Sequence, residues 1–204
     1  MSRIPPPPTL VAMRSLLQLA RLIDVMNDRI GRAVSWLAAV MVLLGAFNAI
    51  ARYLSRALGK DLSSNAYLEG QWYLFSVILL IGMAYTLRHD RHVRVDVIYG
   101  KVGERGKAWI DLLGTLLFLL PFSIVTLILT WPTVHNSWLT REVSPDPGGL
   151  PRYPLKAVIL VGFGLLLLQG LSMLIRQVAF LRGDTSVRSE CPLGEGPGGH
   201  GEGV

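Results

Sequence analysis

The sequence has almost no cysteine and unusually little charge. Cys191 is the only cysteine among 204 residues. A single cysteine excludes an internal disulfide and any CxxC metal or redox motif. Charged residues make up 17% of the chain and hydrophobic residues 51%, whereas about 25% of a soluble domain is charged. The composition therefore favours a protein that spends much of its length out of water.

Charged residues are absent from four long stretches of the chain and are not simply sparse throughout it. Residues 33–51, 70–87, 112–134 and 157–175 contain no Lys, Arg, Asp or Glu. A helix needs about 20 mostly apolar residues to cross the hydrocarbon core of a bilayer. We therefore predict an all-α integral membrane protein with four transmembrane helices. The predicted spans are about 33–54, 70–87, 110–134 and 157–175, within a membrane domain of residues 33–176.

The segments on either side of this domain have a different composition. Residues 1–32 begin with a proline-rich lead, followed from Thr9 to about Arg32 by polar residues every three or four positions. This spacing predicts an amphipathic helix that lies at the membrane interface and runs into the first span; a helix docked on a soluble partner is the alternative. Residues 177–204 are rich in glycine towards their end, and we expect a disordered tail.

Basic residues predict the orientation. If both termini and the loop between the second and third spans are cytoplasmic, 14 of the 20 Lys and Arg residues lie inside. The positive-inside rule therefore favours an N-in, C-in, multi-pass protein with cytoplasmic tails. The net charge of +6 is then explained by topology, and we expect membrane lipids and no nucleic acid as partners.

Residues that would carry chemistry are scarce. A haem-binding membrane subunit needs histidines inside its spans, but His89, His92, His135 and His200 all lie outside the predicted spans or at their ends. We therefore expect no enzyme, no metal and no cofactor. Deep polar residues are few, and Asn48 and Gln169 are expected to form hydrogen bonds between helices. Pro121 is expected to kink the third span, because proline removes one backbone donor.

Charged residues beside the spans are more informative. Arg52 lies at the outer end of the first span, and Glu69 immediately precedes the second. The two either meet across the outer interface or each reach water separately.

These residues belong to a larger pattern. It comprises Arg52, Glu69, Gly82 and the string Leu87, Arg88, His92, Val93, Arg94, Val95 and Asp96, and later Glu142, Val143, Ser144, Gly148, Gly149, Leu150, Pro151, Pro154, Leu155 and Lys156. Over about 33–176 the chain thereby resembles the small permease subunit, DctQ-like, of tripartite ATP-independent periplasmic (TRAP) transporters, in the variant with an extended third loop.

The resemblance implies a function and partners. Such subunits pair, in the bacterial inner membrane, with a large permease that carries the substrate and sodium sites. A periplasmic substrate-binding protein delivers an organic acid, and the extended loop favours 2-oxo or other monocarboxylates. The small subunit acts as a scaffold, which agrees with the four charge-free stretches 33–51, 70–87, 112–134 and 157–175. The alternatives are a membrane-anchor subunit of a redox enzyme, which would bind haem or quinone, and a small self-assembling channel, which would need a polar stripe along a span.

Two groups of residues are candidates for contacts with partners. The subunit-interface candidates are Asn48, Arg52, Glu69, Trp72, Arg88, Arg94, Asp96 and Gln169. The docking candidates for the binding protein lie in an outer loop predicted over residues 135–156 and stiffened by four prolines; they are Trp138, Arg141, Glu142 and Arg152. In the other interpretation of this loop, Trp138 belongs to the membrane belt and the loop packs on the large permease.

Overall fold

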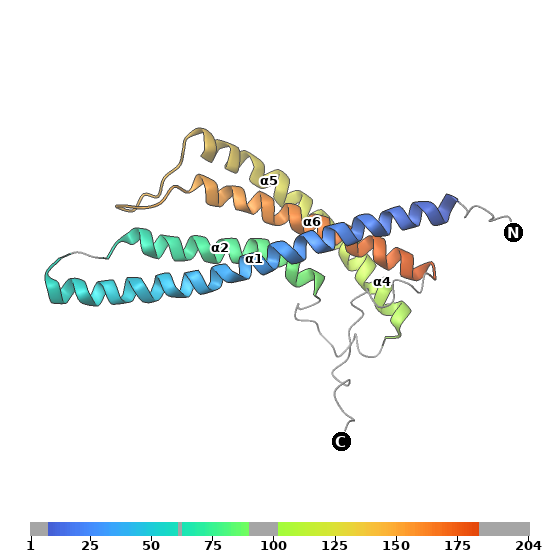
Figure 1. Cartoon of the computed structure of the whole chain (residues 1–204). Helices are drawn as coiled ribbons and strands as arrows, with labels where there is room; N and C mark the ends of the chain where they lie inside the picture. The colour runs from blue at the N-terminus through green and yellow to red at the C-terminus, as the bar shows by residue number, and fades with distance from the viewer. Residues whose placement is uncertain (1–7, 61–62, 90–101, 184–204) are drawn as a thin grey trace, which may run out of the picture.

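The computed structural model describes residues 8–60, 63–89 and 102–183, and most of the chain in these ranges is helical (Figure 1). The helices are α1 (Pro8–Leu58), α2 (Asn65–Arg88), α4 (Glu104–Gly114), α5 (Leu120–Leu139) and α6 (Tyr153–Leu181), with a π-helical turn, η1 (Thr115–Leu119), between α4 and α5. No strand occurs in the described ranges, and four helical segments are long and apolar enough to span a membrane. The predicted fold class is thus confirmed. The proline-rich lead and the glycine-rich tail lie outside the described residues.

The first helix is longer than one membrane crossing requires. α1 has 51 residues, which at 1.5 Å per residue is about 75 Å. The predicted amphipathic segment and the first span are therefore parts of one unbroken helix. α1 is followed by Gly59, whose φ of 63° ends the helix in the left-handed conformation that glycine adopts without strain. Ser64 then caps α2 by accepting a hydrogen bond from the backbone N–H of Ala66 at 3.2 Å.

The third predicted span contains an irregular turn rather than a plain proline kink. η1 ends just before Pro121, and the N–H of Leu120 reaches back five residues to the carbonyl of Thr115. Such a π-turn re-pairs backbone groups next to a residue that cannot donate. The helix then continues through Pro132 to Leu139.

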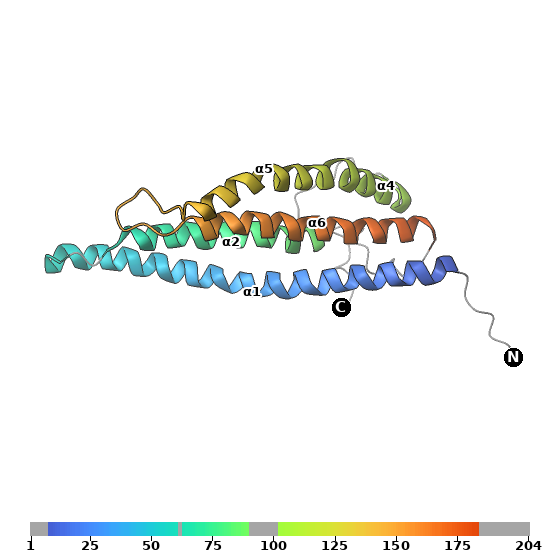
Figure 2. The same cartoon turned by 90° about the horizontal axis from the view of Figure 1, so that it is seen from above.

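α6 is the centre of the bundle and packs against α1, α2, α4 and α5. Viewed from above, α1 and the α4–α5 segment lie on opposite sides of α6 (Figure 2). A Cβ added at Gly162 of α6 would lie 2.7 Å from the carbonyl oxygen of Leu80 in α2. Glycine at this position therefore permits the close approach of α6 to α2.

The outer connection is shorter than the sequence predicted. Because α5 extends to Leu139 and α6 starts at Tyr153, the connection is residues 140–152 rather than 135–156, and Trp138 lies on a helix. An isolated antiparallel bridge between Val143 and Pro151 folds the connection back on itself. The correction has a simple cause, since polar residues at a helix end do not by themselves stop a helix.

Candidate functional site

A buried group of polar side chains connects α1 to α6. It consists of Asp24 and Asn27 from α1 with Gln169, Ser172 and Arg176 from α6, and we call it the inner polar cluster. Each of the five residues is at most 8% exposed. A buried polar group is costly unless it is hydrogen-bonded, and the arrangement of the cluster provides most of the required partners.

The carboxylate of Asp24 is the hub of this cluster. Its Oδ1 accepts from Gln169 Nε2 at 2.9 Å and from Ser172 Oγ at 2.8 Å, while its Oδ2 forms an ion pair with Arg176. Asn27 Nδ2 donates to Gln169 Oε1 at 2.7 Å. The prediction that Gln169 forms an interhelical hydrogen bond is confirmed.

The end of α2 joins the same region. Arg88 donates to the backbone carbonyl of Asp24, and its Nη1 lies 3.3 Å from Asp28 Oδ1. His89 Nε2 also lies 3.4 Å from Asp28 Oδ1. The contacts of Arg88 and Gln169, both subunit-interface candidates, therefore lie at least partly within this chain.

A second polar group holds the outer connection against α2. Glu69 is 6% exposed; its Oε1 accepts from Ser144 Oγ, and its Oε2 accepts from the backbone N–H of Leu150 at 2.6 Å. Tyr73 donates its hydroxyl to the carbonyl of Leu150 at 3.3 Å. The ion pair considered between Glu69 and Arg52 is not formed, because both oxygens of Glu69 accept from the loop.

The base of the same connection is closed by Glu142. Its Oε2 accepts from Ser137 Oγ at 2.8 Å and pairs with Lys156 of α6. These hydrogen bonds, first from Lys156 and then from Ser137, lower the pKa of the Glu142 carboxyl below its usual value of 4.5. We call Glu69, Glu142 and their partners the loop clasp.

The four docking candidates therefore differ in role. Arg152 Nη2 donates to Ser144 Oγ at 3.3 Å, so Arg152 and Glu142 both hold the loop together. Arg141 has a φ of 46° and is exposed. Trp138 is 51% exposed, and its ring meets Tyr153 edge-on at a centroid distance of 4.8 Å. Only Arg141 and Trp138 present much of their surface.

The outer half of α1 carries a polar groove. A cavity of about 380 Å³ is lined by Gly45, Asn48, Ala49, Arg52, Tyr53 and Arg56, which we call the α1 groove. These positions repeat every three or four residues and so share one helix face. Asn48 is only 5% exposed, yet its Oδ1 has no hydrogen-bond partner among the residues that the structure describes. Arg52 forms no ion pair with any described residue.

The remaining interface candidates divide in two. Trp72 is 68% exposed on α2, as expected for a side chain that faces lipid or a partner. Arg94 and Asp96 lie outside the described residues. Among the described residues, no three His, Cys, Asp or Glu side chains come close enough to hold a metal ion.

Comparison with known families identifies this architecture. A family model described as "Tripartite ATP-independent periplasmic transporters, DctQ component" matches residues 41–180. The chain belongs to the DctQ family. It is therefore a small membrane component of a tripartite transporter. No curated protein and no solved structure matches the chain.

The DctQ match includes only part of the inner polar cluster. Gln169, Ser172 and Arg176 fall within it, whereas Asp24 and Asn27 precede residue 41. The α1 groove and the loop clasp lie wholly within the matched range.

Sequence reasoning missed most of the inner polar cluster. Asp24 was placed on the polar face of an interfacial helix, and Asn27, Ser172 and Arg176 were given no role. One signal was available, because Gln169, Ser172 and Arg176 recur at helical spacing at the end of an otherwise apolar span. A polar stripe of this kind predicts a polar partner on a neighbouring helix.

Proposed function

We propose that this DctQ-family chain is the scaffold subunit of a TRAP transporter and that its α1 groove binds the large permease. The observation that carries the proposal is the buried, unpartnered Oδ1 of Asn48 beside Arg52. In the apolar part of a membrane an unsatisfied polar atom is costly, and a contact with a second subunit would remove that cost.

The chemistry of the groove limits what can fill it. Ala49 has a small side chain, which allows a neighbouring helix to approach closely, whereas the space beside Gly45 is filled by Gln71 of α2. Arg52 and Arg56 add positive charge at the outer end of the groove. A transmembrane helix of the large permease that carries a hydrogen-bond donor and, one or two turns away, an acidic side chain is complementary to this surface.

A scaffold role also agrees with the spans themselves. Residues 33–51, 70–87, 112–134 and 157–175 contain no ionisable Lys, Arg, Asp or Glu, whereas transport sites in membranes usually contain such groups. We therefore assign the sodium and substrate sites to the large permease. The proposed substrates are organic acids, with a preference for monocarboxylates. The bacterial inner membrane is the expected location, with both termini cytoplasmic.

The test measures assembly. The full chain is co-expressed with the large permease, and the amount of permease that co-purifies is measured for Asn48→Leu, Arg52→Gln and, as a control on the same helix, Arg29→Gln. Both groove variants should retain several-fold less permease than the wild type, and the control should retain as much. Wild-type recovery with both groove variants would show that the permease binds elsewhere.

We further propose that Trp138 and Arg141 contribute to docking of the periplasmic binding protein. Arg141 has no structural partner in the loop clasp, so a charge reversal there leaves the connection folded. Arg141→Glu should slow binding-protein-dependent uptake while the membrane complex stays intact. Unchanged uptake, or loss of the complex, would instead favour a loop that packs on the permease.

A further inference from the structure

A second cavity lies beside the inner polar cluster, where α1, α2 and α6 meet. Its volume is about 310 Å³, and each of the three helices contributes one arginine to its wall: Arg21, Arg88 and Arg176. Val25 and Met173 give it an apolar side. This cavity lies at the opposite end of α1 from the α1 groove.

The wall of this cavity carries an excess of positive charge. Among the described residues, Asp24 is the one carboxylate that lines it, and both oxygens of Asp24 already accept hydrogen bonds from Gln169, Ser172 and Arg176. Arg88 also pairs with Asp28, at 3.3 Å. A guanidinium carries five N–H donors in a planar fork. Three guanidinium groups therefore offer more donors than Asp24 and Asp28 together can accept. Phosphate oxygens match guanidinium groups well in geometry and charge.

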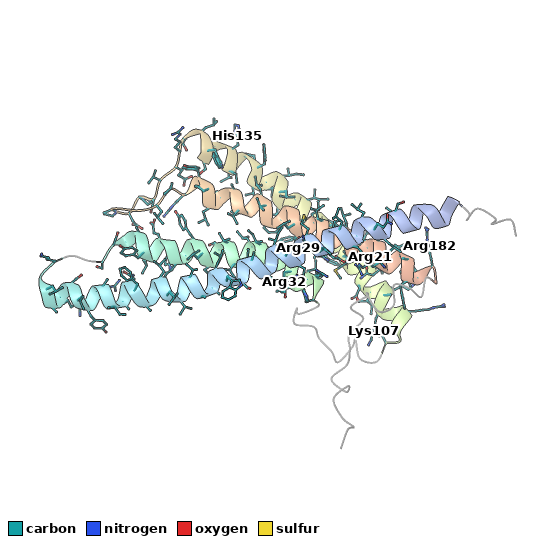
Figure 3. The ribbon with its side chains drawn as sticks, viewed as in Figure 1. Arg21, Arg29, Arg32, Lys107, His135 and Arg182 are labelled. Atoms are coloured by element: carbon teal, nitrogen blue, oxygen red, sulfur yellow. The ribbon has the colours of Figure 1, made fainter. Side chains whose placement is uncertain are left out.

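The cavity also lies at a definite depth. Arg88 and Arg176 immediately follow the charge-free stretches 70–87 and 157–175, so they mark the level at which the apolar parts of α2 and α6 end. That level is the headgroup region of a bilayer. Arg21, Lys107 and Arg182 lie in the right-hand part of the molecule and Arg29 and Arg32 near the middle of α1, whereas His135 lies at the upper left (Figure 3).

Next to the cavity, the exposed face of α1 is apolar. Leu22 is 67% exposed and Val25 is 45% exposed. A molecule with a phosphate in the cavity and hydrocarbon chains along these residues would satisfy both surfaces. Basic pockets between membrane helices are suited to anionic headgroups for this reason.

We propose that this cavity binds a phosphate group, with Arg21, Arg88 and Arg176 as its donors. A phospholipid headgroup supplies the phosphate, and its acyl chains lie against the apolar surface of α1. Because the site takes one contact from each of three helices, its occupant ties α1 to α2 and α6. Free inorganic phosphate has the same chemistry, and the experiment separates the two sources.

The test uses the full chain, with any subunit that co-purifies, after delipidation in mild detergent. Binding of phosphatidylglycerol is measured by native mass spectrometry and by the shift in thermal unfolding. Diacylglycerol with the same acyl chains lacks the phosphate, and inorganic phosphate lacks the chains. Arg21→Gln is the test variant, because Arg21 is exposed and lies outside the inner polar cluster. Arg29→Gln is the matched control, since it removes from the same helix an exposed arginine that does not line the cavity.

We expect one phosphatidylglycerol per chain, no binding of diacylglycerol, and about tenfold weaker binding in Arg21→Gln. Arg29→Gln should bind as the wild type does. Stabilisation by inorganic phosphate alone, with the same dependence on Arg21, would support the phosphate site and assign it to the free ion. Equal binding of diacylglycerol, or equal losses in the two arginine variants, would overturn the proposal. Unfolding without ligand should be the same in both variants.

Discussion

Removing the negative charge of Asp24 should destabilise the bundle far more than breaking a surface ion pair on the same helix. Asp24→Asn keeps the shape of the side chain and a carbonyl that can accept from Gln169 or Ser172. It leaves the guanidinium of Arg176 without its carboxylate at a position that is 8% exposed. An uncompensated buried charge is the main expected cost.

The burial of the two ion pairs sets the size of the difference. Breaking a buried pair by removing one partner costs about 3–5 kcal/mol. Arg32 also pairs with Asp28, at 2.7 Å, but its side chain is 66% exposed, and exposed pairs contribute about 0–1 kcal/mol. Arg32→Gln is therefore the control. The double variant Asp24→Asn, Arg176→Gln should cost less than the sum of its single changes, because the double variant leaves no unpaired charge in the buried site.

The free energy of unfolding can be measured by titrating the purified chain with SDS in mixed micelles and following tryptophan fluorescence. Asp24→Asn should lower the midpoint strongly and Arg32→Gln hardly at all. Equal effects of the two variants, or strict additivity in the double variant, would refute the argument that Asp24 and Arg176 stabilise each other in a buried site.

Three further predictions follow from other parts of the molecule. Gly162→Ala should cost about 1–3 kcal/mol in the same assay, because its Cβ would collide with backbone; Gly164→Ala, whose Cβ meets nothing within 4 Å, should be nearly neutral. The lowered pKa of Glu142 means that its pairing with Lys156 stabilises the connection above pH 4.5 and is lost as the pH falls through the lower folded-state pKa. The protection factors of the amides in residues 140–152, which correct for the intrinsic pH dependence of exchange, should therefore fall only in acid, and a Glu142→Gln variant should show low protection at every pH. Cys191 should react with an impermeant maleimide only after the membrane is opened; labelling in intact spheroplasts would reverse the proposed orientation.

Much of the fold follows from local sequence. Four charge-free stretches predict four apolar helices, because a segment that long cannot remain out of water without satisfying its backbone groups internally. The ends of the helices were predicted less well, since the first span was expected to end at about 54 and the second to begin at 70, whereas α1 ends at Leu58 and α2 begins at Asn65. The end of α5 was not readable, and the outer connection was predicted too long for that reason.

The sequence by itself therefore determined how many segments of the described chain are long and apolar enough to span a membrane, because this property depends on neighbouring residues. The partners of the buried charged side chains Asp24, Glu69 and Arg176 were decided by tertiary structure. Asp24 and Arg176 are 152 positions apart, and no local pattern links them. The sequence left Glu69 with either Arg52 or water as its partner. The fold of residues 140–152 brought Ser144 and Leu150 to its carboxylate instead. Which side chains meet depends on how long helices cross and where a connection folds back, and a buried carboxylate pairs with the donors that this packing brings within reach.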